Sequence, residues 1–243
     1  MDVEFIGQSV EYVGGYGGDE TIESAARTCT QTEVGDDSEG FVKRLVERGH
    51  MSPTEFGWAD FQIECDRAIQ QELTRHRHFT YNIESTRLIN YVKKALRYVT
   101  KPPDGMDVPD ECVECLEEYC ALGARLYESW SNAGVPRDYL RKFFTLALAS
   151  RVRMAGNSRA WAEMIAKRVV KAAHPEIREI ANAVAGELGT RFKGLFGSLN
   201  AIANRPVGEK TATSERPKGH RFRVKASDLL NYHRGTPNER VSD

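Results

Sequence analysis

The chain has 243 residues, of which 40% are hydrophobic and 28% charged, and its formal net charge at pH 7 is −1. This length and composition predict one globular domain with a full hydrophobic core. The near-zero net charge excludes strong attraction of the whole molecule to nucleic acid, so any basic function must be local.

In the first third of the chain, apolar periodicity and turn residues predict short strands and helices. We expect strands at 3–6, 9–13 and 58–65, helices at 19–28, 38–48 (with Ser38 as N-cap) and 66–77, and a flexible hairpin turn at 14–18. This glycine-rich turn lacks the Lys-Ser/Thr of a P-loop and the strand–helix setting of a dinucleotide fingerprint. A phosphate-binding loop is therefore the less favoured alternative.

Beyond residue 77 the chain is predicted to run extended and then to become mostly helical. We expect a loop at 101–105, helices at about 109–132 and 136–149, a strand at 150–155, a helix at 159–173 capped by Asn157 or Ser158, and a helix at about 176–203. A domain over 1–204 is predicted to end before a polar tail at 205–243.

The cysteines and the first residues bear on the compartment. An odd count of five cysteines favours reduced thiols. The first residues lack the basic start and apolar stretch of a secretory leader, and no apolar run approaches transmembrane length. We therefore expect a cytoplasmic protein with no membrane contact.

Cys112 and Cys115 form a C-x-x-C pair, with Cys120 five residues beyond. A zinc site would need a fourth ligand, and neither a second pair nor a close histidine supplies one. We interpret these cysteines as core residues of a helix and expect no metal. The predicted inward stripe comprises Cys112, Cys115, Leu116, Tyr119 and Leu122.

The segment from Arg75 to Arg87, RHRHFTYNIESTR, has an unusual composition, with three arginines, two histidines, no lysine and one acid. A solvated helix face would mix Lys and Glu. Guanidinium groups suit phosphate oxygens and planar rings, because they bind bidentately and stack. The alternatives are a nucleic-acid patch and an ion-pair cluster at a subunit interface.

The spacing of this segment resembles the signature of the flavin-dependent thymidylate synthases: Arg-His-Arg, seven residues, Ser, and Arg two positions later. Three other segments resemble elements of the same family, in the same order. They are Gly49-His50 with Ser52-Pro53 and Glu55, then Gly134-Val135-Pro136-Arg137 followed by Arg141, and Asn157-Ser158-Arg159 followed by Arg168, where the family carries a substrate arginine.

The resemblance implies an α+β fold, a mixed sheet packed with helices, assembled as a homotetramer with active sites shared between subunits. It implies a methyltransferase for the FAD-dependent reductive C5 methylation of a uridylate. Methylenetetrahydrofolate would be the carbon donor, NADPH the reductant and dUMP the expected substrate class.

The same resemblance assigns roles by position. The residues implied to bind FAD are His50, Arg75, His76, Arg77, Asn157 and Arg159. The residues implied to bind the nucleotide are Glu72, Ser85, Thr86, Arg87, Arg141 and Arg168. Arg168, which would polarise the uracil ring, and Ser85 are the catalytic candidates. Ser85 is not assigned as a nucleophile, because no general base is visible beside it.

The residues alone do not decide the roles of Arg168 and Arg141. Arg168 is expected on an apolar helix stripe, where a guanidinium costs several kcal/mol unless an anion or hydrogen-bond acceptors meet it. A buried ion pair and a ligand carbonyl or phosphate are the two interpretations; for Arg141 they are a rim salt bridge and a ligand. The predicted stripe comprises Trp161, Met164, Ile165 and Ala172.

Departures from the family pattern surround the kept residues. Ile83 stands where the family has Glu, with Glu84 displaced by one; Glu72 replaces a Gln, and Ala172 and Phe56 replace histidines. These changes favour a substrate choice that includes UMP. No cysteine has a convincing activating base for thiolate addition at uracil C6, and a flavin hydride route removes the need for one.

Two other functions remain open. A catalytically silent paralogue would keep FAD without turnover. A nucleic-acid-binding module would use the Arg/His/aromatic cluster for phosphates and base stacking, which the net charge disfavours.

Overall fold

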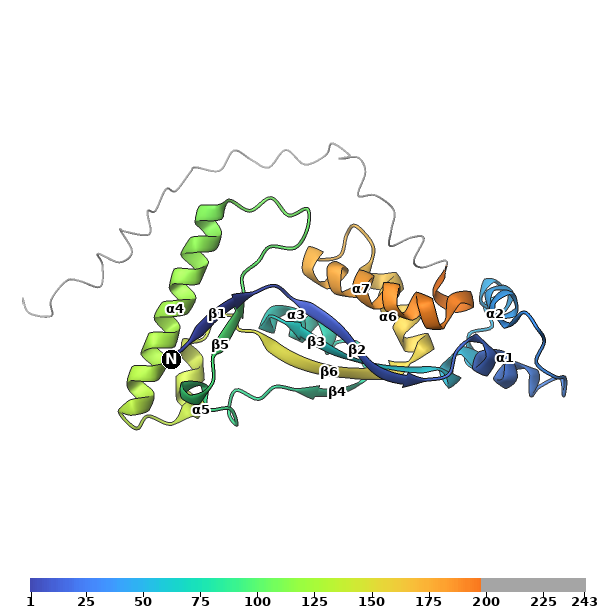
Figure 1. Cartoon of the computed structure of the whole chain (residues 1–243), viewed down its shortest axis with the longest axis horizontal. Coiled ribbons are helices and arrows are strands. Elements are labelled where there is room, and N and C mark those ends of the chain that lie inside the picture. Colours follow the sequence, from blue (N-terminus) through green and yellow to red (C-terminus); the bar gives the residue numbers. More distant parts are fainter. Residues whose placement is uncertain (198–243) are drawn as a thin grey trace, which may run out of the picture. The chain divides into compact units, whose positions relative to one another are not determined.

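The central sheet is built around β3 (Trp58–Cys65), in which every second side chain is buried. The computed structural model describes residues 1–197. β3 pairs antiparallel with β2 (Ser9–Tyr16) on one side and with β6 (Ser150–Asn157) on the other. β4 (Thr80–Ile83) pairs with the far edge of β6, so the strand order is β2-β3-β6-β4 (Figure 1).

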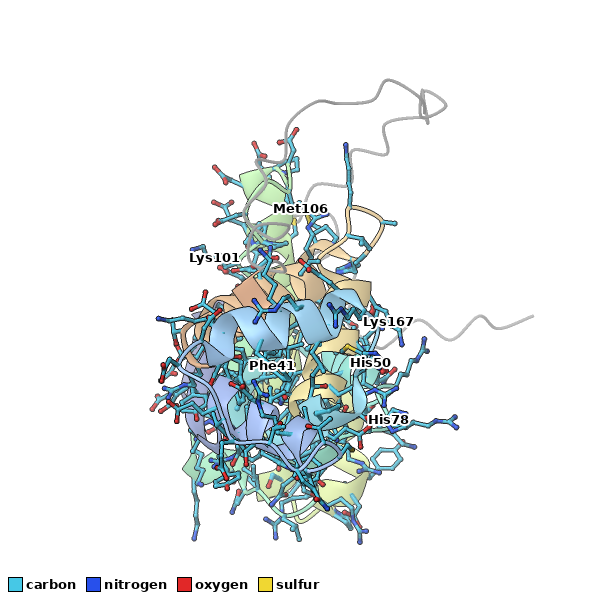
Figure 2. The ribbon with its side chains drawn as sticks, turned by 90° about the vertical axis from the view of Figure 1, so that its right-hand side faces the viewer. Phe41, His50, His78, Lys101, Met106 and Lys167 are labelled. Carbon is cyan, nitrogen blue, oxygen red and sulfur yellow. The ribbon has the colours of Figure 1, made fainter. Side chains whose placement is uncertain are left out.

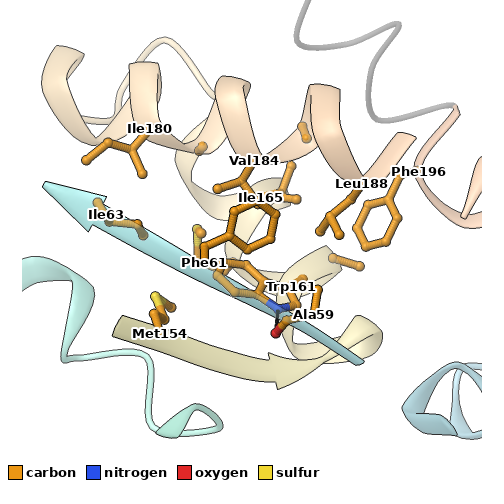
Figure 3. Packing of buried hydrophobic residues seen from close by; sticks show 14 of the residues in the cluster. Ala59, Phe61, Ile63, Met154, Trp161, Ile165, Ile180, Val184, Leu188 and Phe196 are labelled. Carbon is orange, nitrogen blue, oxygen red and sulfur yellow. Dashed lines mark hydrogen bonds between the residues drawn. The ribbon is translucent and has the colours of Figure 1, made fainter. Parts of the chain in front are cut away.

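Three helices pack on the apolar face of this sheet: α3 (Arg67–Leu73), α6 (Ser158–Arg168) and α7 (Pro175–Arg191). Figure 3 shows side chains of α6 and α7 meeting those of β3 and β6. The other face carries half-exposed polar side chains. The buried cluster includes Phe61, Ile63, Met154, Trp161, Ile165, Ile180, Val184 and Leu188.

Trp161 lies at the centre of this core and is fully buried. Its ring centroid is 5.0 Å from that of Phe61 and 4.6 Å from that of Phe79. Its indole N–H donates to the carbonyl of Ala59 at 3.1 Å, so the buried donor is satisfied. Burying a side chain such as Phe61 stabilises the fold by roughly 1.5–3 kcal/mol. Since Phe79 belongs to the Arg75–Arg87 segment, the core helps to fix that segment.

A second hydrophobic core surrounds a parallel pair of strands, β1 (Val3–Ile6) and β5 (Leu96–Val99). The long helix α4 (Asp110–Asn132) packs with β1 and with the short helix α5 (Arg137–Leu140). The buried residues of this core are Tyr91, Leu96, Tyr98, Cys120, Ala124, Tyr127, Leu140, Ala147 and Leu148.

Two helices and a 3-10 turn connect β2 to β3. Glu23 of the first helix is completely buried; it accepts from Arg27 Nε at 2.7 Å and from the backbone N–H of Gly35 at 3.1 Å, which ties the helix to the following loop. These elements are α1 (Asp19–Arg27), α2 (Ser38–Glu47) and η1 (Ser52–Phe56); two further 3-10 turns are η2 (Tyr91–Lys93) and η3 (Arg141–Phe143).

The predicted α+β architecture of helices packed on a sheet is confirmed, but the strands do not form one mixed sheet. The four-stranded sheet is entirely antiparallel, and the parallel pair β1–β5 is separate. Among residues 1–197 no helix is both long and apolar enough to cross a membrane. The predicted 176–203 helix is interrupted at Phe192, because α7 ends at Arg191. The predicted end of that helix at 203, the boundary at residue 204 and the 205–243 tail lie outside the described residues.

The predicted hairpin turn at 14–18 is wrong. β2 continues to Tyr16 through a bulge between Tyr12 and Gly14, and only Gly17 has a left-handed φ, of +85°. Two helices, not a hairpin, join β2 to β3. The predicted N-cap Ser38 is also wrong, since the carboxylate of Asp37 accepts from the Gly40 N–H at 2.8 Å.

Three predicted helices are too long. The 66–77 helix ends at Leu73, and the 159–173 helix ends at Arg168, which leaves Ala172 exposed. Only Arg137–Leu140 and η3 are helical within 136–149. The remainder contains a turn at 146–147, after which Leu148 bridges to Tyr98 and the Ala149 N–H donates to the carbonyl of Arg97 at 2.8 Å beside β5.

The predicted inward stripe of α4 is wrong at three of its five positions, while Leu116 is partly buried against the second core, as predicted. Cys112, Cys115 and Tyr119 are exposed, whereas Cys120 is buried. The helix instead turns a different face to its core, formed by Cys120, Gly123, Ala124 and Tyr127. Among the described residues, no three His, Cys, Asp or Glu side chains are grouped to hold a metal ion.

We expect Gly156→Ala to destabilise the protein by roughly 1–3 kcal/mol, through overpacking against the ring of Phe79. A Cβ at Gly156 would lie 2.5 Å from Phe79 Cδ1, and that ring is held against Trp161. Urea denaturation measures the effect.

The matched control is Gly186→Ala on α7, where a Cβ meets nothing within 4 Å. This variant should gain roughly 0.5–1 kcal/mol from helix propensity. Equal free energies of unfolding for the two variants would contradict the packing argument.

Candidate active site

The hydroxyl of Tyr81 organises the start of the Arg75–Arg87 segment. It donates to the carbonyl oxygens of Leu73, at 2.6 Å, and His76, at 2.8 Å. These carbonyls lie where α3 ends, and the last carbonyls of a helix have no partner within the helix. Burial raises the pKa of Tyr81, which keeps the hydroxyl a donor. The chain therefore turns between α3 and β4, with Arg75 and Arg77 exposed.

Arg168, the last residue of α6, joins this turn. Its Nη1 donates to Glu72 Oε2 at 3.0 Å, and its Nε donates to His76 Nε2 at 3.1 Å. The acceptor role requires a neutral imidazole at that nitrogen. Burial, together with the positive charges of Arg168 and Lys167, lowers the pKa of His76 to about 4. His76 is therefore neutral at physiological pH.

This geometry answers part of the question about Arg168. Trp161, Met164 and Ile165 are buried as predicted, and Arg168 is half-buried, with 22% of its side chain exposed. The structure shows the ion-pair interpretation, with Glu72 as partner. A ligand contact by Arg168 stays a prediction, because only two of its five N–H donors are used by these partners.

A second group of predicted residues meets where β6 passes into α6. Of the two predicted caps, Asn157 and Ser158, it is Asn157 that caps the helix, because its Oδ1 accepts from the Ala160 N–H at 2.8 Å. Arg159 pairs with Glu55 at 2.7 Å and with Glu163 at 3.2 Å. A cavity of about 290 Å³ is lined by Glu55, His78, Asn157, Arg159, Ala160 and Glu163.

This cavity brings together three sequence segments: the one that contains His50 and Glu55, the start of the signature, and the Asn157–Arg159 element. His50 itself is exposed just before η1. In Figure 2, His50, His78 and Lys167 lie toward the same side of the molecule. Of the predicted cofactor residues, Asn157 and Arg159 line the cavity, whereas His50, Arg75, His76 and Arg77 are not among its lining residues.

The end of the signature forms another group, around the turn after β4. Ser85 Oγ accepts from the Arg87 N–H at 3.3 Å, and Arg87 pairs with Asp138 at 3.1 Å. Arg137 donates to the carbonyl of Leu88 at 3.5 Å, so the Gly134–Arg137 turn meets the signature here. Among its described contacts, Ser85 has no general base. Thr86 lies in the same turn, and Arg141 is exposed in η3.

The predicted nucleotide residues therefore fall into two groups within one chain. Glu72 and Arg168 lie at the start of β4, and Ser85 and Arg87 lie beyond its end. A strand of four residues spans roughly 13 Å. The structure does not bring all of these residues into contact.

Glu55, Glu163 and Tyr81 were not among the predicted site residues. Glu163 could have been found, because it is four residues after Arg159 on a helix and so shares its face. Glu55 stands in a segment that was recognised, but its contact with Arg159 spans 104 positions. The role of Tyr81 could not be predicted from the sequence, because the helix was expected to continue to residue 77 and its true end, which Tyr81 contacts, was not recognised.

The cysteines offer no activated thiol at these groups. Cys65 and Cys120 are buried, and desolvation raises the pKa of both thiols. Cys29, Cys112 and Cys115 are exposed, and none of the five lines the Arg159 cavity or contacts Arg168. This arrangement does not favour a thiolate nucleophile.

The four segments that resemble the family signature all lie within one matched region. A sequence model of the thymidylate synthase complementing protein family matches residues 11–192. The chain belongs to this family. The predicted family and enzyme class, a methyltransferase of the flavin-dependent thymidylate synthase type, are confirmed.

Individual relatives agree. The chain is 30% identical over 219 residues to a flavin-dependent thymidylate synthase of Mycobacterium avium, covering 82% of this chain and 86% of the relative. It is 28% identical over 192 residues to a probable flavin-dependent thymidylate synthase of Mycobacterium phage L5, covering 73% and 79%.

The fold is also similar to a solved structure. The crystal structure of the UMP/dUMP methylase PolB from Streptomyces cacaoi, bound with 5-Br dUMP, superposes with a TM-score of 0.69. It covers 82% of this chain and 97% of that chain at 20% sequence identity.

We expect His76 to make the protein less stable as the pH falls from about 6.5 toward 4. An unfolded histidine takes up its proton below about 6.5, whereas folded His76 does so only near 4. Within this window the unfolded state binds more protons, so the free energy of unfolding falls with pH.

Urea denaturation between pH 4.5 and 7 should show a steeper fall for the wild type than for His76→Gln. His78→Gln, a change at the exposed neighbouring histidine, is the control and should follow the wild type. A His76→Gln curve parallel to the wild type would mean that His76 titrates normally.

Proposed function

We propose that the chain catalyses the FAD-dependent reductive methylation of a uridylate at C5, acting on dUMP and also on UMP. Methylenetetrahydrofolate is the proposed carbon donor and NADPH the proposed reductant. The observation that carries this proposal is the meeting of Arg168, Glu72 and His76 beside the exposed Arg75 and Arg77. The names of the relatives and of the solved structure support the same chemistry.

In this proposal the flavin dinucleotide is held by residues of the Arg159 cavity together with the exposed Arg75 and Arg77. Arg75 and Arg77 are exposed and suit a diphosphate, because guanidinium forks bind phosphate oxygens. Arg159 already has two carboxylate partners, so it is better suited to orient neutral groups of the cofactor than to hold its phosphates. In this proposal His50, His76 and Asn157 complete the cofactor site.

The bound flavin would supply the hydride that reduces the transferred carbon unit. The chain's own residues bind and orient the substrates. Arg168 directs its remaining N–H groups at the uracil ring, while Ser85, Thr86, Arg87 and Arg141 hold the nucleotide around its phosphate. Ser85 acts here as a hydrogen-bonding group. The buried thiols of Cys65 and Cys120 support a route without a cysteine nucleophile.

We further propose a homotetramer with shared active sites, working in the cytoplasm. Two observations support shared sites. None of the described contacts of Ser85 or Arg87 is with Arg168. Exposed apolar side chains also follow one another along α4, a pattern typical of interfaces. They are Tyr119, Leu126 and Trp130.

A catalytically silent flavoprotein is the second candidate. The observation that favours it is the Glu72–Arg168 ion pair, which occupies the arginine that would polarise the ring. Tritium release from C5-labelled dUMP separates the two: release at a catalytic rate supports the enzyme, and flavin binding without release supports the silent paralogue.

We expect the purified protein to carry FAD, and the double variant Arg75→Ala/Arg77→Ala to lose it while remaining folded, because both side chains are exposed. The flavin absorbance spectrum and the thermal midpoint measure the two effects. Lys101→Ala/Arg125→Ala, which removes two other exposed cations, is the matched control and should stay yellow. A wild type that stays colourless after incubation with FAD would contradict the proposal.

We expect measurable C5 methylation of UMP alongside dUMP. Ile83 and Glu72 change the polarity around the nucleotide, and Glu84 engages only one carboxylate oxygen with Tyr91, at 2.9 Å, so the other can accept from a ribose hydroxyl. A site that merely tolerates an added hydroxyl discriminates weakly, by up to roughly a hundredfold. Competition between the two nucleotides at equal concentration measures the ratio, and complete rejection of UMP would limit the enzyme to dUMP.

A further inference from the structure

Glu72 has a different place in the structure from the one its position in the signature implied. Its carboxylate does not point freely into a nucleotide site; it accepts from Arg168 Nη1 at 3.0 Å, with 30% of its side chain exposed. His76 accepts from Nε of the same guanidinium at 3.1 Å. Two edges of Arg168 are thus held by two residues on either side of the end of α3.

Two contacts on different edges fix a planar guanidinium much better than one does. A single hydrogen bond leaves the long arginine side chain free to rotate, and its rotamer entropy is about 2 kcal/mol. The contacts to Glu72 and His76 leave the other N–H groups of Arg168 available in a defined orientation.

We propose that Glu72 is a positioning residue: with His76 it orients Arg168 for the uridylate, and its negative charge offsets part of the arginine's positive charge. This inference rests on the proposed function. It makes Glu72 act through Arg168, not through its own contact with the nucleotide. The charged groups that act on His76 beside this guanidinium are Lys167 on α6 and Glu72 on α3, and His76 itself is neutral.

The offset of charge has a consequence for the ligand. A uridine monophosphate is an anion, so a carboxylate next to its arginine weakens binding, while the same carboxylate orders that arginine. Glu72→Gln keeps an acceptor oxygen for Arg168 and removes the charge. Glu72→Ala removes both. The two variants therefore separate orientation from charge.

The test is the dissociation constant of dUMP for the FAD-loaded protein, measured by isothermal titration calorimetry, with the thermal midpoint of each variant. Glu72→Ala should weaken dUMP binding about tenfold or more relative to the wild type, with only a small change in the thermal midpoint, because the pair is partly exposed. Glu72→Gln should bind dUMP at least as tightly as the wild type.

The matched control is Glu187→Gln, which breaks an Arg–Glu pair of 3.1 Å on α7, with Arg191. It should bind dUMP as the wild type does. If Glu72→Ala melts lower but keeps wild-type affinity, the pair is structural and the inference is wrong. If Glu72→Gln binds as weakly as Glu72→Ala, Glu72 acts by its charge or by direct contact, and the positioning role is wrong. A wild type that binds neither dUMP nor UMP would overturn the proposed function, and this inference with it.

Discussion

The hydroxyl of Tyr81 is the interaction on which the candidate site depends. It lies within 2.8 Å of two carbonyl oxygens, those of Leu73 and His76, and so closes the C-terminus of α3 while standing on β4. A helix end buried without such partners would leave polar groups unsatisfied. Because one side chain joins the helix end to the strand, the turn between them has a fixed shape, and this turn carries Arg75, His76 and Arg77.

The hydrophobic core also fixes this turn, through the side chain of Phe79 that follows it. Phe79 packs edge-on against the buried ring of Trp161, and Gly156 leaves room for it. Trp161 and Arg168 both belong to α6, so the core that anchors Phe79 also sets where Arg168 emerges. The same residues therefore determine both the stability of the fold and the geometry of the site, and we expect substitutions at Gly156 to affect both.

The charges of the site are largely paired within the chain. Arg168 has Glu72, Arg159 has Glu55 and Glu163, and Arg87 has Asp138. Such pairs are partly exposed, so each contributes little to stability, typically about 0–1 kcal/mol. Their effect is mainly on orientation and on local potential. Arg75 and Arg77, for which the described part of the chain shows no ion-pair partner, are the cations proposed to bind the cofactor. The paired arginines are those whose guanidinium groups are held in one orientation.

The sequence by itself determined the family and most of the elements. Alternation in Trp58–Cys65 gave the central strand because one face of the sheet is buried, and the apolar spacing of α6 and α7 gave the helices that cover it. The spacing of arginines, histidines and Ser85 identified the family because it is a local pattern, independent of how the chain folds. Local patterns also narrowed the cap of α6 to Asn157 or Ser158, and the structure shows that it is Asn157.

Only the tertiary structure decided which side chains meet. The partners of Arg168 and Arg159 lie about a hundred positions away in the chain, at Glu72 and Glu55, and no local rule selects them. The early end of α3 depends on Tyr81, which belongs to another element. The inward face of α4 was misjudged because Tyr119 and Cys120 are neighbours that point about 100° apart on a helix, and only packing against the second core decided that Cys120 is the buried one. Secondary structure follows from neighbours in sequence, whereas these choices follow from neighbours in space.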